Sequence, residues 1–168
     1  PFGLCRPNMP EGVPGFDQYD QLYADAKLWL NEGWIDYWTP QLYWAIDSPQ
    51  SFPKLLDFWI AENTMQRHVW PGMGTYNYLA EKFKKGPQEV VDQIEVTRAR
   101  GDEANGQVHF QIETLRNKRL RPLIEQAYGE PALVPASPWL DAVAPDEPFV
   151  NFQLAGDRVA SVAWAQGS

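Results

Sequence analysis

Hydrophobic residues recur at two different spacings along the first 128 residues, one typical of helices and the other of strands. Between Asp17 and Leu30 they follow the i, i+3, i+4, i+7 spacing of a single helical face, with Asp17 in the capping position and Gly33 just past the end. This spacing predicts a helix over 17–30. The apolar positions of its face are Tyr19, Leu22, Tyr23, Ala26 and Leu30.

The stretch from Trp34 to Trp44 has a different pattern. It is too rich in aromatic residues for a surface helix, and Pro40 would break a helix. We therefore expect a buried strand that runs into a loop, as in parallel sheets. Two shorter apolar segments, at 68–73 and 107–112, predict further strands of the same kind.

Helical segments separate these strands. Ser51 stands in the capping position of one helix, with Pro53 tolerated in its first turn. Gly86 opens a second helix that Gly101 ends, and a third helix is predicted over 120–128. Their inward-facing stripes are Phe52, Leu55, Leu56, Trp59 and Ile60; Val90, Val91 and Ile94; and Leu120, Leu123, Ile124 and Ala127.

With a strand stub at 1–4, the first 128 residues make four strand-then-helix units of about 30 to 40 residues each. Such units form a parallel sheet, either open and doubly wound or closed into an eight-stranded barrel. Gly72-Met73-Gly74 lacks the third glycine of a dinucleotide-binding turn and is interpreted as a strand-end loop. The sequence therefore predicts an α/β fold over 1–128 that is half of a (β/α)8 TIM-type barrel.

The pattern changes after Gly129. Closely spaced prolines predict a linker over 129–148. Apolar residues then alternate on both sides of Gly156, which predicts a β-hairpin over 149–168. Because a lone hairpin is marginal in water, we expect this small β region to begin a truncated all-β domain or to dock on the barrel.

Charge narrows the classes of function. The chain has 14 Lys and Arg against 22 Asp and Glu, which gives a net charge of −8. A protein that neutralises nucleic-acid phosphates needs a basic face, so this charge argues against nucleic acid as a partner. The short positive clusters at 82–85 and 116–121 are interpreted as solvated surface.

Composition excludes other classes. Cys5, His68 and His109 cannot complete a zinc site of four Cys and His ligands, so we expect neither a structural metal nor another cofactor. No apolar run reaches the roughly 18 residues that cross a bilayer, so we expect no membrane span. The chain begins Pro1-Phe2-Gly3-Leu4, with neither Met nor a signal segment, which predicts a fragment of a longer protein.

In a β/α barrel the site lies at the C-terminal ends of the strands, where each strand turns into its loop. The residues there combine aromatic rings with amide and charged groups. Aromatic rings cover the apolar faces of sugars, and the polar groups bind hydroxyls, so this mixture predicts a carbohydrate groove. The binding candidates are Arg6, Gln41, Tyr43, Trp44, Trp70, Tyr76 and Gln111, and the catalytic candidates are Asp47 and Glu113.

Several candidates keep a structural alternative. Trp44 could stack on a sugar or simply pack, and Gln41 could bind a neighbouring strand as well as a ligand. Glycoside cleavage needs two carboxylates about 5–5.5 Å apart for retention or about 6.5–9.5 Å apart for inversion. Asp47 and Glu113 are the strand-end acids that the chain offers, and no nucleophile-elbow motif occurs.

Motifs within residues 1–128 point to one bacterial family. They are Pro1-Phe2-Gly3 with Arg6; Asp36-Tyr37 followed by Pro40-Gln41-Leu42-Tyr43-Trp44; and Ser51-Phe52 with Leu55, Leu56 and Trp59. They resemble the glycosyl-hydrolase-like 10 family of bacterial secreted proteins and lipoproteins with a (β/α)8 barrel. The resemblance implies the C-terminal half of the barrel and groove-lining roles for Arg6, Gln41, Tyr43 and Trp44. It also implies action on cell-wall glycan or a related polysaccharide, in the extracellular space or periplasm, by a parent that is lipid-anchored.

The sequence departs from this family in two ways. The family's aspartate-rich catalytic motif does not occur, so we expect the main acid upstream of this chain. Cys5 and Gln111 replace an aromatic residue and a serine. The first hypothesis is therefore part of a secreted glycoside hydrolase, the second is a non-catalytic carbohydrate-binding barrel, and the third is a structural half barrel. Half a barrel has two open sheet edges, through which we expect a homodimer.

Overall fold

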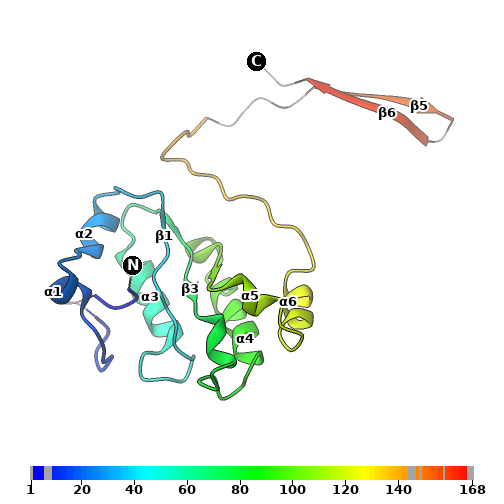
Figure 1. The fold of residues 1–168 in the computed structure, drawn as a ribbon. Helices are drawn as coiled ribbons and strands as arrows, with labels where there is room; N and C mark the ends of the chain where they lie inside the picture. The colour runs from blue at the N-terminus through cyan, green and yellow to red at the C-terminus, as the bar shows by residue number, and fades with distance from the viewer. Residues whose placement is uncertain (1, 6–8, 144–146, 148, 157, 166–168) are drawn as a thin grey trace. The chain divides into compact units, whose positions relative to one another are not determined.

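The computed structural model divides the chain into two compact units, Pro1–Pro135 and Ala136–Ser168 (Figure 1). The parallel strands and the helices lie in the first unit, and an antiparallel hairpin lies in the second. The residues that the structure describes are 2–5, 9–143, 147, 149–156 and 158–165.

Short strands alternate with helices in the first unit, so the predicted mixed α/β class is confirmed. The strands are β1 (Tyr37–Trp38), β2 (His68–Val69), β3 (Gly72–Met73) and β4 (Val108–His109). The α-helices are α1 (Gln18–Leu22), α2 (Ala26–Asn31), α3 (Phe52–Glu62), α4 (Gln88–Arg98), α5 (Ile112–Leu115) and α6 (Arg121–Ala127). The 3-10 helices are η1 (Thr75–Tyr78) and η2 (Gly101–Ala104).

The strands run parallel to one another and follow the order of the chain. β1 pairs with β2, and β3 pairs with β4. Isolated parallel bridges join Gln41 to Phe2 on one side and to Gly72 on the other, so the 37–42 segment lies between two neighbours. No closed barrel forms among the described residues. The half barrel and a dimer through its edges therefore stay predictions.

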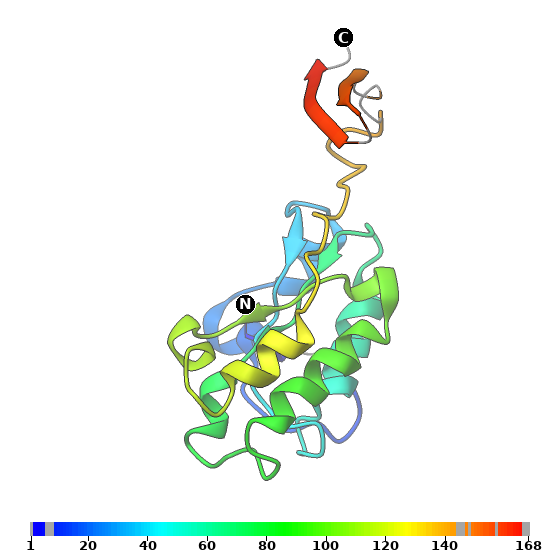
Figure 2. The ribbon, with the colours of Figure 1, turned by 90° about the vertical axis from the view of Figure 1, so that its right-hand side faces the viewer.

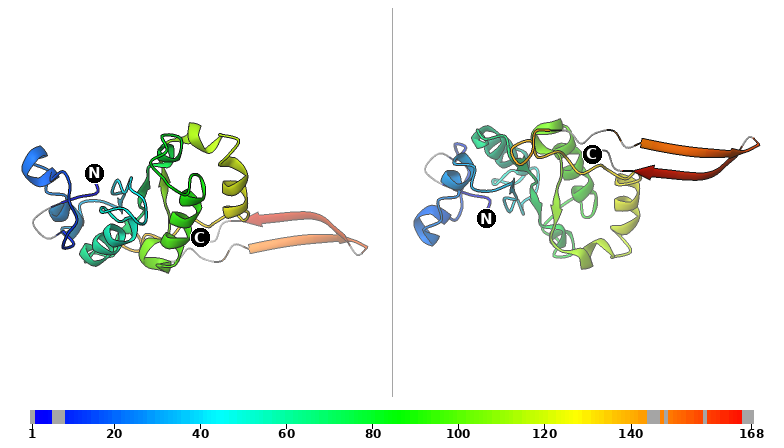
Figure 3. Two further views of the ribbon diagram at one scale, coloured as in Figure 1. Left: turned by 90° about the horizontal axis from the view of Figure 1, so that it is seen from below. Right: turned by 90° about the horizontal axis from the view of Figure 1, so that it is seen from above.

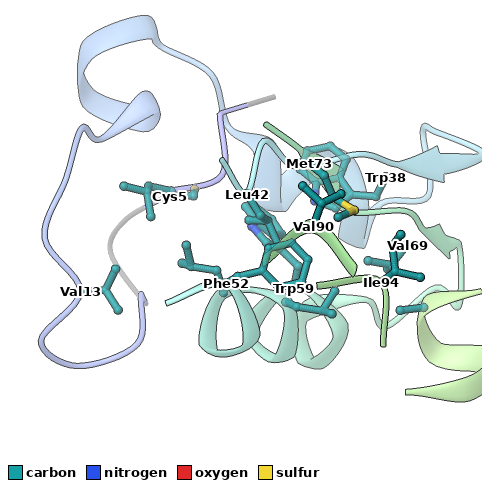
Figure 4. Packing of buried hydrophobic residues seen from close by; sticks show 14 of the residues in the cluster. Cys5, Val13, Trp38, Leu42, Phe52, Trp59, Val69, Met73, Val90 and Ile94 are labelled. Atoms are coloured by element: carbon teal, nitrogen blue, oxygen red, sulfur yellow. The ribbon is translucent and has the colours of Figure 1, made fainter. Parts of the chain in front are cut away.

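Helix α3 shows how the helical stripes build the core. Its Trp59 ring lies 5.0 Å from the Trp38 ring of β1, and its indole N–H donates to the carbonyl oxygen of Gly3 at 2.9 Å. Figure 4 shows these side chains between the strands and α3. Ser51 does not cap the helix as predicted, because its hydroxyl donates to the carbonyl oxygen of Ile46. The predicted stripe is otherwise confirmed, with full burial of Phe52, Leu55, Leu56 and Trp59.

Helices α3, α4 and α6 pack side by side in that order, as Figures 2 and 3 show. Helix α4 buries Val90 and Ile94, as its stripe predicts. Gly101 follows this helix with φ of +58°, a left-handed conformation that favours glycine. This row of helices covers one side of the strands and leaves the strand ends to the connecting loops.

The prediction of one continuous helix over 17–30 is wrong. Tyr23 adopts a left-handed conformation with φ of +53° and ends α1, and α2 begins three residues later. Asp17 and Asp25 each accept a hydrogen bond from a backbone N–H in the turn that follows, so each begins a helix of its own. The first part of the predicted stripe is consequently in solvent, and Tyr23 is 92% exposed.

The second unit contains β5 (Phe149–Ala155) and β6 (Arg158–Ala165), which pair in an antiparallel hairpin. This confirms the predicted hairpin, and Gly156 takes φ of +65° beside its turn. Between α6 and β5 the described residues form no helix or strand. That the hairpin begins a larger β domain stays a prediction. None of the helices in the described part of the chain has the length and apolar character needed to cross a membrane.

Candidate functional site

Three aromatic rings meet where the strands end. Tyr43 follows the 37–42 segment, Tyr76 follows β3 and Phe110 follows β4. The Tyr43 ring stacks on the Phe110 ring at 5.9 Å between centroids, and it meets the Tyr76 ring edge to face at 6.0 Å. Because successive parallel strands end at the same side of a sheet, residues far apart in sequence form one cluster, here called the strand-end cluster.

The loop that carries Tyr43 is held by buried side chains of the next unit. The Asn77 side-chain amide donates to the carbonyl oxygen of Tyr43 at 2.7 Å. The Gln93 amide of α4 donates to the carbonyl oxygen of Trp44 at 3.1 Å, and the Glu89 carboxylate accepts from the backbone N–H of Ile46 at 2.7 Å. Since Asn77, Glu89 and Gln93 are buried, these bonds fix the loop in position.

A cavity of about 590 Å³ lies beside the strand-end cluster. This volume is in the usual range for small-ligand sites. Leu79 and Ala80 give it an apolar wall. Its other lining residues are polar, and they are Tyr76, Gln111, Glu113, Thr114, Arg116 and Asn117.

Most of these polar groups are free to bind a ligand. Thr114 is buried and already bonded, since its hydroxyl donates to the carbonyl oxygen of Gln111 at 2.6 Å. By contrast, the side chains of Gln111, Glu113 and Arg116 are exposed and have no hydrogen-bond or ion-pair partner among the described residues. A cavity with an aromatic ring, amides, a carboxylate and a guanidinium suits a polyhydroxylated ligand.

Tyr43 of the strand-end cluster keeps its proton at neutral pH. Burial raises the pKa of Tyr43 above its ordinary value, and the neighbouring Tyr76 raises it further. A neutral phenol can both donate and accept a hydrogen bond. Tyr43 therefore contributes an uncharged hydroxyl to the cluster.

The structure brings together three of the residues that the sequence singled out, namely Tyr76, Gln111 and Glu113, in the lining of this cavity. Tyr43 lies next to them through its contact with Tyr76. Gln41, two residues before Tyr43, has an exposed side chain and uses its backbone to bridge Phe2 on one side and Gly72 on the other.

Two other candidates lie away from the cavity lining. Trp44 is half-buried, and its ring meets that of Phe2 edge to face at 5.8 Å, which is the packing alternative. Asp47 is exposed and close to Lys85, whose pKa is raised by its hydrogen bond to Asp92 and, more weakly, by Asp47. Arg6 lies outside the described residues.

Trp70 lies at the opposite end of the strands. Its ring stacks on Tyr37 at 4.9 Å and on His68 at 5.3 Å. Its indole N–H donates to the side-chain oxygen of Asn105 at 2.8 Å, and the Asn105 amide lies 3.2 Å from the His68 ring. Tyr37, His68, Trp70 and Asn105 are here called the strand-start cluster. They contact one another, and none of them lines the cavity.

Arg116 and Asn117 are cavity-lining residues that the sequence interpretation missed, because the positive cluster at 116–121 was assigned to solvated surface. Their spacing was a usable signal. They stand three and four residues after Glu113, and residues at this spacing share one side of a helical turn. Among the described residues, no group of three or more His, Cys, Asp or Glu side chains could hold a metal ion.

Comparison with known proteins relates the chain to carbohydrate-cleaving enzymes. It is 35% identical over 160 residues to the glycosyl hydrolase YngK of Bacillus subtilis (strain 168), a match that covers 88% of this chain. A 48-residue part, 29% of the chain, is 35% identical to the glycosyl hydrolase DigH of Escherichia coli (strain K12). No family model matches the chain. The similarity along most of the chain supports a relationship to glycosyl hydrolases.

The chain spans 31% of the length of the Bacillus relative and 11% of the Escherichia relative in these matches. A DigH protein of Shigella flexneri matches over the same short length.

Proposed function

We propose that the chain is part of a secreted glycoside hydrolase that acts on a polysaccharide. The observation that carries this proposal is the cavity beside the strand-end cluster, in a chain 35% identical to a protein named glycosyl hydrolase. The cavity lies where catalytic groups gather in parallel β/α proteins. Its aromatic wall and free amide and charged groups match the two faces of a sugar ring.

Three of the cavity residues have a specific role in this proposal. The Tyr76 ring carries the apolar face of a sugar, with Tyr43 and Phe110 packed behind it. The amide of Gln111 binds hydroxyls at the rim. Glu113 acts on the glycosidic bond as one member of an acid–base pair. The second carboxylate, the main catalytic acid, comes from a part of the protein upstream of this chain.

The substrate and location follow from the family resemblance. Bacterial cell-wall glycan is the proposed polysaccharide, and the proposed place of action is the extracellular space or periplasm, with a lipid anchor on the full-length parent. The remaining carried-over residues, Arg6 and Gln41, bind further along the glycan. Trp44 supports the loop of Tyr43 through its contact with Phe2.

A second candidate function is a carbohydrate-binding domain without catalysis. One observation favours it: Glu113 is the single carboxylate among the described residues that line the cavity, and Asp47 lies elsewhere. Both families of glycosidase mechanism need two carboxylates across the bond. Binding without cleavage is the expected behaviour of a cavity that contains one.

The two functions separate in an experiment on purified cell-wall glycan strands. For the hydrolase, the full-length protein releases new reducing ends, and Glu113→Gln lowers that rate by about a hundredfold or more. The matched control is Glu103→Gln, an exposed carboxylate in η2 outside the cavity, which keeps the rate. Glycan binding without new reducing ends supports the second function. If the full-length protein neither binds nor cleaves the glycan strands, both functions are contradicted.

A further inference from the structure

One short segment supplies the charged groups of the cavity. Glu113 lies in α5, and Arg116 follows one turn later as the C-cap residue of this helix. Both side chains line the cavity, yet no ion pair forms between them. Each exposed side chain therefore keeps its charged group available to a ligand.

Arg116 differs from the other arginines of its segment. Arg119 lies over the ring of Tyr78, 6.0 Å from its centroid. Arg121 binds the carboxylate of Glu125 at 2.7 Å. Within the described part of the chain, the Arg116 guanidinium has no such partner, and it is the one arginine that lines the cavity. The segment thus keeps one cation unpaired at the position where a ligand would sit.

The charge of the chain as a whole makes this unpaired cation informative. A chain with net charge −8 repels anions, so an anionic ligand gains nothing from the general field of the protein. A local guanidinium can overcome this repulsion, because it forms two parallel hydrogen bonds with a carboxylate. A neutral sugar gains less from the cation, because its hydroxyls can accept hydrogen bonds from the guanidinium but carry no charge for it to neutralise.

We propose that the cavity selects a saccharide unit that carries a carboxylate, and that Arg116 binds this carboxylate. This inference rests on the proposed glycan-binding function of the same cavity. Arg116 is then a specificity-determining residue, while Tyr76 and Gln111 bind the uncharged part of the ring. Glu113 in the same cavity favours a singly charged group over a phosphate or sulfate polymer, because a second carboxylate repels a more highly charged anion.

The test compares saccharides that differ in the charge of their carboxyl groups. The probes are the tetrasaccharide of alternating N-acetylglucosamine and N-acetylmuramic acid as the free acid, its dimethyl ester in which both carboxyl groups are neutral, and neutral chitotetraose. Affinities of the full chain are measured by isothermal titration calorimetry. We expect the free acid to bind about tenfold more tightly than the ester, the scale of one charge-assisted hydrogen-bonded pair at an open site.

Variants assign this difference to one residue. Arg116→Gln should bind acid and ester equally, with an unchanged melting temperature. The matched control is Arg121→Gln, which removes one positive charge from the same segment outside the cavity and should keep the tenfold preference. A preference lost in both variants would show a general charge effect and overturn the assignment to Arg116.

The outcomes also distinguish the carboxylate preference from the proposed glycan-binding function on which it rests. Equal binding of acid, ester and chitotetraose to the unaltered chain overturns the carboxylate preference and leaves the glycan-binding function intact. No binding of any of the three overturns both. Because the acid and ester are compared on the unaltered chain, the decision does not depend on how a variant folds.

Discussion

Two clusters of rings lie at opposite ends of the same parallel strands, and their polar atoms behave differently. In the strand-start cluster, the indole N–H of Trp70 and the ring of His68 both bind the Asn105 side chain. The strand-end cluster instead borders a cavity in which the side chains of Gln111, Glu113 and Arg116 have no partner in the described part of the chain. Ring content is similar, so ring content does not distinguish a site from a core.

The two clusters differ in whether their polar groups already have hydrogen-bond partners within the protein. A polar atom bonded within the protein stabilises the fold and has little left to offer a ligand. A polar atom that points into a cavity without a partner is bound only to water, which a ligand can displace. We therefore assign stability to the strand-start cluster and binding to the strand-end cluster, and each of the following changes tests that division.

The largest expected effect is that of Trp70→Ala. Removing this ring takes away two stacking contacts and one hydrogen bond, and it should lower the free energy of unfolding by about 3 kcal/mol. Glycan affinity should be unchanged. Urea denaturation and calorimetry measure the two quantities. The matched variant is Tyr76→Ala at the other end, which should weaken glycan binding about tenfold at a smaller cost in stability. A loss of binding in a folded Trp70→Ala protein would break the comparison.

Glu89→Ala should have the next largest effect, and it should change both the stability of the fold and the loop of the strand-end cluster. The variant leaves the partly buried N–H of Ile46 without its carboxyl acceptor, which should cost about 2 kcal/mol of stability. Because the loop that holds Tyr43 is loosened, the Ile46 amide should also exchange its hydrogen faster. Native-state hydrogen exchange measures this. Glu95→Ala, an exposed carboxylate on the same helix, is the control and should change stability by less than about 0.5 kcal/mol.

Low pH should destabilise the folded protein through protonation of His109. Burial lowers the pKa of His109 to about 4, and its ring binds the hydroxyl of Tyr128, whose pKa burial raises to about 12. The folded state therefore disfavours the charged ring. Its contribution to stability is complete above the unfolded pKa near 6.5 and is lost as the pH falls from there to about 4. We expect a loss of about 1–2 kcal/mol, less than a fully buried ring would give.

Urea denaturation across this pH range checks the expectation, with His109→Gln as the variant that should flatten the change. The pKa of His68 is also lowered by burial, so a smaller slope of the same sign should remain in that variant. An unchanged slope in His109→Gln would assign the effect to the strand-start cluster alone. Ring proton shifts from NMR titration identify which histidine takes up the proton.

Local patterns were enough to predict much of the first unit. The stripe of α3 was predictable because Phe52 and Trp59 stand on one helical face between a proline in the first turn and a polar end. The parallel order of the strands followed from their alternation with helices. The break at Tyr23 was not predicted. Asp25 caps a new helix, but the spacing of apolar residues alone does not distinguish such a cap from an aspartate inside a longer helix.

The candidate site was less predictable for a different reason. That Tyr76, Gln111 and Glu113 line one cavity follows from where strands end, which the sequence indicates. Whether a ring packs or faces solvent depends on its neighbours in space, so Trp44 and Trp70 had the same expected role as Tyr76 and lie elsewhere. Arg116 was missed since a charge at an exposed helix end has the same pattern whether or not a cavity lies beside it.

A pair of amide residues gives the smallest and most specific test of the division. Asn105→Ala removes the shared partner of Trp70 and His68, and it should lower the free energy of unfolding by about 1 kcal/mol while glycan affinity stays the same. Gln111→Ala removes an amide of similar size from the cavity rim. Its side chain has no partner among the described residues, so stability should stay within about 0.5 kcal/mol.

Glycan affinity should respond in the opposite order, falling about fivefold in Gln111→Ala through the loss of one hydrogen bond to a hydroxyl. Both quantities are measured on both variants, by urea denaturation and by calorimetry with chitotetraose. We therefore expect Asn105→Ala to lower stability alone and Gln111→Ala to lower glycan affinity alone. Both substitutions remove a side-chain amide, and they differ only in whether that amide is already bonded within the fold. Parallel losses in both variants would mean that bonding within the fold does not separate the two clusters, and the strand-end cavity would lose its main argument as the binding site.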